Sequence, residues 1–175
     1  MTEVRGMTAA DCPRVAEIRV GGWRTAYRGL VPQPYLDAMD VTEETELLRT
    51  RLRQGDGNVV NLVAERDGEV LGWAAHGPYR DGERHTPDAE LYALYVHPGH
   101  HGAGLGHALL QESMRRCTAA GHARMYLWVL EGNHRARRFY ERGGFHADGA
   151  QAPFEVAGVA VPEVRYVRAM AVQRR

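Results

Sequence analysis

Three glycines spaced two residues apart stand where a predicted strand meets a predicted helix. Gly102, Gly104 and Gly106 follow an apolar segment, 89–96, and precede a helical pattern that ends near Ala120. Glycine lets a backbone approach a ligand closely, and a helix N-terminus carries about half a positive charge. Amide N–H groups in such a turn can bind phosphate oxygens. Packing alone also produces glycine-rich turns between a strand and a helix, so the loop by itself leaves both interpretations open.

The two common nucleotide-binding glycine motifs do not fit this loop. A Walker loop has Lys and then Ser or Thr after its last glycine, whereas His107 and Ala108 follow Gly106. A dinucleotide-binding turn has the spacing Gly-x-Gly-x-x-Gly and belongs to a first strand–helix–strand unit. The present spacing is Gly-x-Gly-x-Gly, and the loop lies past the middle of the chain. A phosphate ligand of this loop therefore belongs to another class.

Two segments in the second half of the chain resemble the cofactor motifs of the GNAT family, the Gcn5-related N-acetyltransferases. The acetyl-CoA loop of that family reads Gln/Arg-x-x-Gly-x-Gly/Ala, and residues 101–106 read His-Gly-Ala-Gly-Leu-Gly. A second family motif is matched within 127–145 by Leu127, Val129, Asn133, Ala136, Phe139, Tyr140, Gly144 and Phe145. The two motifs occur in the family's order, and the resemblance extends from about Val59 to Phe145.

The resemblance implies an N-acetyltransferase that moves the acetyl group of acetyl-CoA, its co-substrate, directly to a primary amine. The implied cofactor contacts lie on the strand before the loop, on the loop and at the start of a later helix: Leu94, Tyr95, Val96, His101, Gly102, Ala103, Gly104, Leu105, Gly106, His107 and Asn133. His101 departs from the family pattern, because a neutral imidazole brings less charge to a diphosphate than arginine does. We expect the backbone amides of the loop to provide most of the binding.

Two side chains are candidates for proton transfer. An alkylamine with a pKa near 10 must lose a proton before it attacks a thioester. The resemblance places Glu90 where several family members take that proton through a water, and strand alternation predicts that Glu90 shares a face with Tyr92, Leu94 and Val96. The family pattern also places the hydroxyl of Tyr140 near the cofactor sulfur, where it protonates the leaving thiolate. The plain alternatives are a solvated glutamate and a core tyrosine.

The acceptor site is implied less sharply. Trp23 and Tyr27 lie where the family usually builds it, and an aromatic rim would attract an amine cation, although a plain core would use the same residues. The basic segment 135–142 faces either a phosphate of the cofactor or solvent. The histidines near the glycine loop predict no metal site, because no cysteine or carboxylate completes a tetrahedral set.

Local patterns predict the elements that must position these residues. They are a helix 8–22 capped by Thr8 and ended by Gly21-Gly22, a helix 42–54, a hairpin 59–76 with its turn at Asp67-Gly68, a polar loop 79–88, a strand 124–130, a helix 133–142 capped by Asn133, and two strands within 145–170. This order predicts a mixed α/β fold in a single domain, 1–175. The resemblance adds a central, mostly antiparallel sheet that splays at the cofactor cleft and is flanked by helices.

Composition excludes several other classes of protein. The chain of 175 residues is 44% hydrophobic, with 22 basic and 22 acidic residues, so it lacks the basic excess of a nucleic-acid binder. Cys12 and Cys117 form no metal or disulfide motif, which favours a reducing compartment. We find no secretory signal, and the longest uncharged stretch, 91–111, contains Pro98. We therefore expect a cytoplasmic protein, a monomer or homodimer, that binds neither membrane nor nucleic acid.

Two alternative functions stay open at this stage. The first is a domain of the same fold that binds acetyl-CoA as a sensor and does not turn it over, an interpretation that only His101 favours. The second is a nucleotide-binding Rossmann protein. Glu131 is roughly placed to accept a hydrogen bond from a ribose hydroxyl, but the glycine spacing does not match that fold. The amine acceptor cannot be read, because acceptor loops vary most in such a fold.

Overall fold

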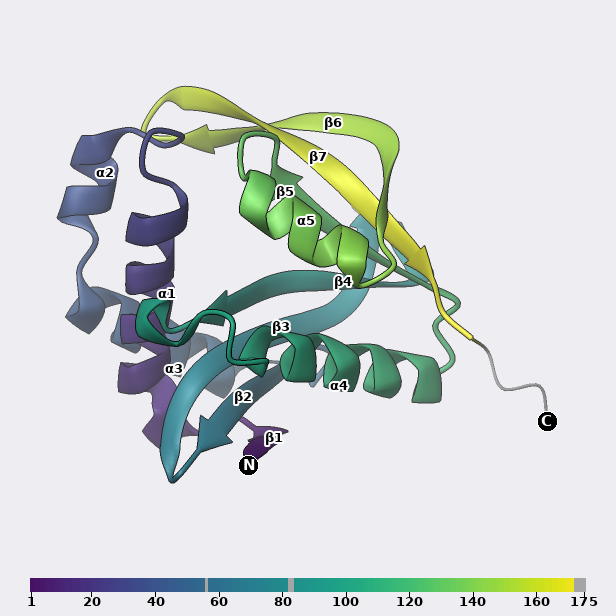
Figure 1. The fold of residues 1–175 in the computed structure, drawn as a ribbon, viewed down its shortest axis with the longest axis horizontal. Coiled ribbons are helices and arrows are strands. Elements are labelled where there is room, and N and C mark those ends of the chain that lie inside the picture. Colours follow the sequence, from purple (N-terminus) through teal and green to yellow (C-terminus); the bar gives the residue numbers. More distant parts are fainter. Residues whose placement is uncertain (56, 82–83, 172–175) are drawn as a thin grey trace.

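A seven-stranded mixed sheet runs through the molecule, with helices on both of its faces (Figure 1). The computed structural model describes residues 1–55, 57–81 and 84–171. The elements are β1 (Thr2–Gly6), α1 (Cys12–Ala26), α2 (Gln33–Ala38), α3 (Val41–Gln54), β2 (Val60–Arg66), β3 (Glu69–Asp81), β4 (Arg84–Val96), α4 (Leu105–Ala119), β5 (Arg124–Leu130), α5 (His134–Arg142), β6 (His146–Val156) and β7 (Val159–Ala169), with short 3-10 turns at Ala9–Asp11 and Pro98–His100. None of the described helices is long and apolar enough to cross a lipid bilayer.

The strand order across the sheet is β1-β2-β3-β4-β5-β7-β6. In the described part of the chain, β4 and β5 form the one parallel pair, and every other neighbouring pair is antiparallel. The predicted fold class, a mixed and mostly antiparallel sheet flanked by helices, is confirmed. The apolar stripes of α4 and α5 cover one face of the sheet, while α1 and α3 cover the other.

Helix α1 extends four residues beyond the C-terminal end that the sequence pattern predicts. It passes through Gly21 and Gly22 and ends at Ala26, so the predicted stop at the two glycines is wrong. A tertiary contact explains why glycine is there: a Cβ on Gly22 would lie 2.8 Å from Cδ1 of Tyr95 on β4. Gly22 therefore lets α1 pack directly against the tyrosine ring, and the helix tolerates the lower helical propensity of glycine in exchange for this close approach.

Substitution of the two glycines should have opposite effects. Gly22→Ala pushes a methyl group into the Tyr95 ring, and we expect a loss of about 1–2 kcal/mol in the free energy of unfolding. Gly21→Ala is the matched control, since its Cβ would meet Pro98 at an ordinary 3.5 Å. The control should gain about 0.5–1 kcal/mol from helical propensity. Urea denaturation measures both, and equal stability of the two variants would contradict the packing argument.

The predicted turn of the first hairpin agrees with the structure, whereas the predicted connection between β3 and β4 does not. The turn between β2 and β3 falls at Asp67-Gly68 with φ angles of 53° and 79°, as predicted for a two-residue turn. The predicted polar loop 79–88 is wrong, because β3 continues to Asp81 and β4 begins at Arg84; residues 82–83 lie outside the described part. The ring of Tyr79 stacks on Tyr126 of β5, with centroids 4.6 Å apart, which holds this extension against the sheet.

A β-bulge in β4 sets the direction of the side chains at the centre of the sheet. Ala75 pairs with Ala93 and His76 with Leu91, so Tyr92 is an extra residue on β4. Leu91 therefore shares the α4 face with Leu94, and Glu90 points to the opposite face, towards α1. The predicted alternation, which put Glu90 on the face of Leu94 and Val96, is wrong for this reason.

The parallel pair of strands separates soon after it forms. β4 and β5 are hydrogen-bonded at three registered pairs, from Ala89–Met125 to Leu91–Leu127. Beyond Leu91 and Leu127 the two strands diverge, and the backbone edge of β4 from Leu94 to Val96 has no strand partner on the β5 side. This opening in the middle of the sheet is the feature around which the candidate site is built.

Candidate active site

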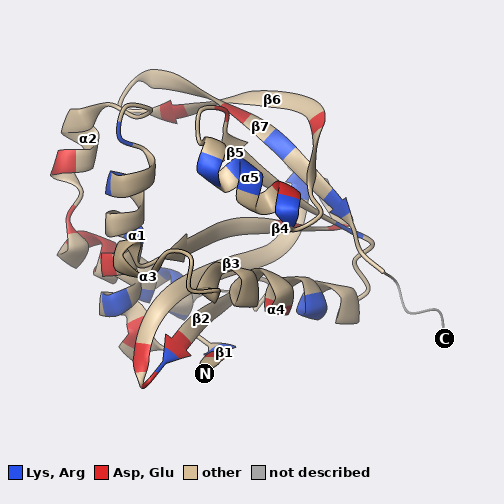
Figure 2. Cartoon of the chain, in the orientation of Figure 1, with Lys and Arg blue, Asp and Glu red and all other residues tan. Residues whose placement is uncertain are grey.

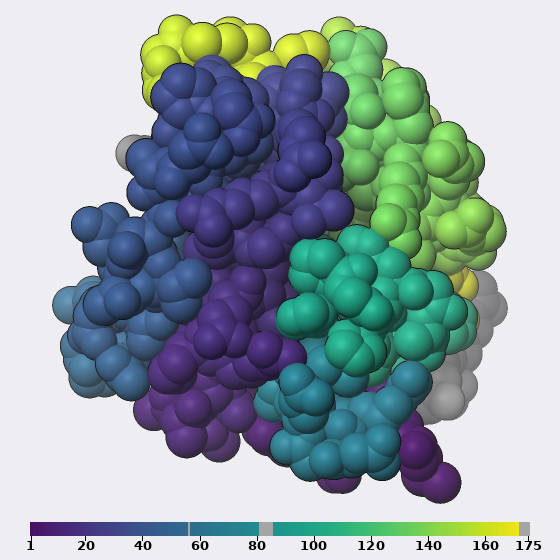
Figure 3. Space-filling model, turned by 60° about the vertical axis from the view of Figure 1, so that its left-hand side comes forward, coloured from purple at the N-terminus to yellow at the C-terminus, as the bar shows by residue number. Residues whose placement is uncertain are grey.

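A cleft of about 790 Å³ occupies the opening between β4 and β5. Its walls come from the β4 segment 90–96, the glycine-rich loop, the end of β5, one side of α5 and the C-terminal end of α1. Figure 3 shows the outer surface where α1, the loop and α5 meet. The cleft thus joins segments from both halves of the sequence, and its volume suits a cofactor or substrate-sized ligand.

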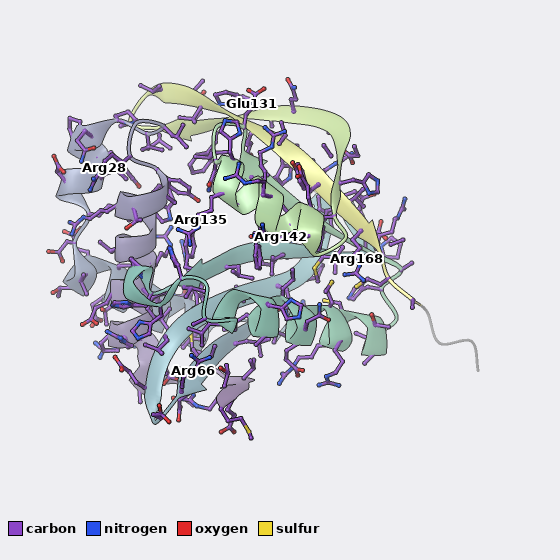
Figure 4. The ribbon with its side chains drawn as sticks, in the orientation of Figure 1. Arg28, Arg66, Glu131, Arg135, Arg142 and Arg168 are labelled. Atoms are coloured by element: carbon purple, nitrogen blue, oxygen red, sulfur yellow. The ribbon has the colours of Figure 1, made fainter. Side chains whose placement is uncertain are left out.

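Most of the predicted cofactor residues line this cleft. They are Leu94, Tyr95, Val96, His101, Gly102, Gly104, Leu105, Gly106, His107 and Asn133. Ala103 is the exception: it packs against the core under α4, and its carbonyl oxygen accepts a hydrogen bond of 2.9 Å from Nη2 of Arg66. Arg66, the last residue of β2, therefore anchors the loop through this carbonyl group (Figure 4).

The loop has the backbone that its glycines predict. Gly102 and Gly104 adopt φ angles of 80° and 83°, where other residues are strained, and Gly104 is the N-cap of α4. At Gly106 the space for a side chain is restricted, since a Cβ there would lie 3.3 Å from Cζ of Phe139 on α5. The loop brings the N-terminus of α4 to the cleft with bare amides, which is suited to an anion.

Arginines of α5 bring positive charge to the part of the cleft beside the glycine-rich loop. His101 places Nε2 3.2 Å from the carbonyl oxygen of Val96, and its pKa is lowered first by burial and then by the nearby guanidinium of Arg135. Arg135 and Arg142 both line the cleft, and neither forms an ion pair within the described residues. Figure 2 shows basic residues along α5, and Figure 4 labels Arg135 and Arg142. Sequence reasoning left 135–142 open between a ligand and solvent; the structure divides the segment, because Arg138 does not line the cleft.

Two α5 residues from the second motif face the same space. Oδ1 of Asn133 accepts a hydrogen bond of 3.3 Å from the amide of Ala136, as predicted for an N-cap. Tyr140 is 9% exposed and packs between Phe139 and Phe145, with ring centroids 5.2 and 6.0 Å away. Burial raises the pKa of the Tyr140 phenol, so this hydroxyl keeps its proton at neutral pH and can act as a donor.

Two carboxylates line the cleft on its α1 side. Burial, and to a lesser extent the nearby carboxylate of Glu163, raises the pKa of Glu90 to about 7. Glu163 lies on β7 opposite Leu130 of β5, and burial raises its pKa as well. Sequence reasoning missed Glu163, because its place beside the cleft depends on β7 inserting between β5 and β6.

The two predicted acceptor residues are placed differently. Tyr27 caps the C-terminus of α1 and lines the cleft. Trp23 is buried at 6% exposure behind the wall and does not line it. Its Nε1 donates a hydrogen bond of 3.0 Å to the hydroxyl of Tyr95, which lies 3.2 Å from the hydroxyl of Tyr27. Trp23 therefore contacts the cleft through Tyr95.

The histidines beside the loop contact one another and the backbone. Nδ1 of His97 accepts a hydrogen bond of 3.1 Å from the amide of Gly99, and the rings of His97 and His100 lie edge to face. Among the residues with described positions, no three histidine, cysteine or carboxylate side chains are grouped to hold a metal ion.

Comparison with known proteins identifies the family. Residues 23–145 match the acetyltransferase (GNAT) family. The "Uncharacterized N-acetyltransferase YuaI" of Bacillus subtilis is 32% identical over 164 residues, which cover 94% of this chain and 91% of the relative. The chain therefore belongs to the GNAT family of acyltransferases, which confirms the predicted family and class of enzyme.

Solved structures share the fold at lower identity. The PaiA N-acetyltransferase of Thermoplasma acidophilum, in complex with coenzyme A, has a TM-score of 0.78 at 20% identity, with 97% of this chain and 99% of that chain covered. YncA of Salmonella typhimurium, solved with acetyl-CoA, has a TM-score of 0.72 at 23% identity, with coverage of 100% and 97%.

Proposed function

We propose that this protein transfers the acetyl group of acetyl-CoA directly to a primary amine, within one domain of residues 1–175. The observation that carries the proposal is the opening between β4 and β5 directly beside a glycine-rich helix N-terminus. The amides of a pantetheine arm can form hydrogen bonds with an unpaired strand edge, and bare backbone amides at a helix N-terminus can bind a diphosphate. The cleft offers both, and the two solved relatives of the same fold hold coenzyme A or acetyl-CoA.

The chemistry follows from the side chains at the inner end of the cleft. Glu90 accepts a proton from the acceptor ammonium, directly or through a water, and the free amine attacks the thioester carbonyl carbon. A backbone N–H on the open edge of β4 between Leu94 and Val96 is a candidate donor to the resulting oxyanion. When the carbon–sulfur bond breaks, Tyr140 gives its proton to the thiolate. The second proton, which the nitrogen loses as the amide forms, restores the Tyr140 hydroxyl, so the products are the acetylated amine and coenzyme A. Neither Cys12 nor Cys117 lines the cleft, which disfavours a cysteine acyl intermediate.

Coenzyme binding and acetyl transfer are tested separately. Calorimetric titration should show saturable binding of coenzyme A to the wild-type protein. A panel of primary amines with acetyl-CoA should then show release of free thiol for at least one amine. A protein that fails to bind coenzyme A would contradict the proposal. Binding without transfer or hydrolysis across the panel would favour the sensor interpretation.

Arg135 should strengthen coenzyme binding by placing its charge opposite His101. We expect Arg135→Ala to raise the Kd for coenzyme A about tenfold, because a charge-assisted contact to phosphate is lost. Arg138→Ala, an exposed arginine of the same helix outside the cleft, is the matched control and should change the Kd less than twofold. Titration with dephospho-coenzyme A separates the diphosphate from the 3′-phosphate, and an unchanged Kd in Arg135→Ala would remove Arg135 from the site.

A further inference from the structure

Three aromatic side chains form a hydrogen-bonded cluster at the α1 wall of the cleft. Nε1 of Trp23 lies 3.0 Å from the hydroxyl oxygen of Tyr95, and that oxygen lies 3.2 Å from the hydroxyl oxygen of Tyr27. Tyr95 is fixed from both sides, by Gly22 of α1 and by the ring of Trp73, whose centroid is 6.1 Å away. Both tyrosines line the cleft, while Trp23 is buried behind them.

The cluster contains one more donor hydrogen than the number of hydrogen bonds that join its three side chains. Indole N–H is a donor without an acceptor site, and each phenol has one O–H. The three groups thus supply three hydrogens, but only two hydrogen bonds join them. Neither phenol has another hydrogen-bond partner within the described residues. Whichever phenol donates in the tyrosine pair, one phenol hydrogen is left for a ligand in the cleft.

The fixed direction of the tryptophan bond identifies the phenol that holds this free hydrogen. Trp23 donates to Tyr95, so a head-to-tail chain continues when Tyr95 donates to Tyr27, and each bond then strengthens the next. The opposite arrangement makes the Tyr95 oxygen accept twice and loses this reinforcement. Tyr27 is therefore the terminal donor. Burial raises the pKa of Tyr27 well above its ordinary value, so the hydrogen is present throughout the working pH range.

The position of this donor points to the acceptor and not to the coenzyme. The glycine loop and Arg135 place the coenzyme phosphates on the side of α4 and α5. The bulge at Tyr92 turns Glu90 to the other face of the sheet, where Tyr95 also points. An amine that gives its proton to Glu90 must therefore approach from the side on which the free phenol hydrogen lies.

We propose that Tyr27, aligned by Trp23 through Tyr95, donates a hydrogen bond to a carbonyl or carboxylate oxygen close to the reacting amine of the acceptor. The acceptor class is thus amino acids, their amides or peptide N-termini, in preference to simple alkylamines. Tyr27 acts here as a specificity residue. The inference rests on the proposed acetyl transfer, since it assigns the second substrate of the same site.

The test uses three probes that share a side chain and differ in the oxygen. Phenylalanine carries a carboxylate, phenylalaninamide carries a neutral carbonyl, and 2-phenylethylamine carries neither. For Tyr27→Phe we expect kcat/KM to fall about tenfold for a probe with the oxygen and less than twofold for 2-phenylethylamine. Comparing each probe between wild type and variant cancels the different pKa values of the three amines. A fall with phenylalanine alone or with the amide alone identifies which oxygen is bound.

Two further variants make the result specific. Tyr27→Phe combined with Tyr95→Phe removes both phenol hydrogens, and its selectivity should be at least as low as that of Tyr27→Phe. Tyr35→Phe is the matched control. Tyr35 is exposed and lies outside the cleft, with its ring centroid 6.0 Å from that of Trp23, so the substitution should leave the selectivity unchanged. Coenzyme A titration of each variant confirms that the coenzyme side of the cleft is intact.

Three outcomes would overturn the inference. An equal fall for all three probes would mean that the phenol serves the thioester oxygen. Unchanged selectivity in the double variant would mean that the free hydrogen meets no ligand. Failure of the wild type to acetylate any of the three probes, while it binds coenzyme A, would exclude this acceptor class. Absence of coenzyme A binding would instead contradict the proposed function.

Discussion

Tyr140→Phe should lower kcat at least about a hundredfold while the Kd for coenzyme A changes less than twofold. A positioned general acid contributes about 10²–10⁴-fold to rate, and the substitution removes a single hydroxyl from an otherwise apolar ring. Tyr140 packs between two phenylalanines, so phenylalanine fills the same space without a cavity. The loss should therefore appear in kcat and not in binding, which steady-state kinetics with the best amine of the panel can measure.

A second tyrosine variant separates catalysis from stability. Tyr166 is 1% exposed, and its hydroxyl donates a hydrogen bond of 2.8 Å to Glu141 and accepts one of 2.9 Å from Arg137. It lies outside the cleft, so Tyr166→Phe should lower the free energy of unfolding by about 1 kcal/mol and leave kcat unchanged. If Tyr140→Phe instead behaves like Tyr166→Phe, with a stability effect and a normal kcat, Tyr140 is a core residue and another group protonates the thiolate.

Features encoded in a few adjacent residues could be predicted from the sequence. The Asp67-Gly68 turn, the N-cap at Asn133 and the glycine loop all depend on local backbone preferences, and each lies where expected. The family motifs are likewise local. They therefore predicted most of the residues that line the cleft beside the glycine-rich loop, with Ala103 as the residue that turns to the core instead.

Features that depend on distant contacts could not be predicted in this way. Gly22 resembles a helix stop in the sequence, but it is a packing position against Tyr95, which is more than seventy residues away. The bulge at Tyr92 reverses the direction of Glu90, and no local signal separates it from a regular strand. Glu163 reaches the cleft only because β7 lies between β5 and β6. The α1 side of the cleft, where we propose that the acceptor binds, is built almost entirely from such contacts.

The two carboxylates on that side produce the second large effect that we expect. Burial, and then the charge of Glu163, raises the pKa of Glu90 to about 7. Glu90 can accept a proton only as the carboxylate, so it is an active base above this pH and inactive below it. The logarithm of kcat/KM for the acceptor should therefore rise more steeply below pH 7 than above it. The break in slope reports the free enzyme.

Glu90→Gln should remove this break and lower kcat about a hundredfold at pH 7. The remaining rate should then follow only the fraction of free amine, and so should climb towards the pKa of the acceptor. Glu163→Gln leaves the base in place and removes a like charge, so the break should move to lower pH with a smaller change in kcat. A break that stays near pH 7 in Glu90→Gln would assign it to another group.

Stability gives an independent measure of the same shifted carboxyl. Folding raises the pKa of Glu90 from about 4.5 to about 7, so between these values the folded state binds more protons than the unfolded state. The contribution of Glu90 is therefore favourable below pH 4.5 and lost as the pH rises through 7. Glu90→Gln should be more stable than wild type at pH 8 and similar at pH 4.5, as measured by urea denaturation. A gain in stability together with a loss of activity would show that the carboxylate is kept in the cleft for its chemistry, at the expense of the fold.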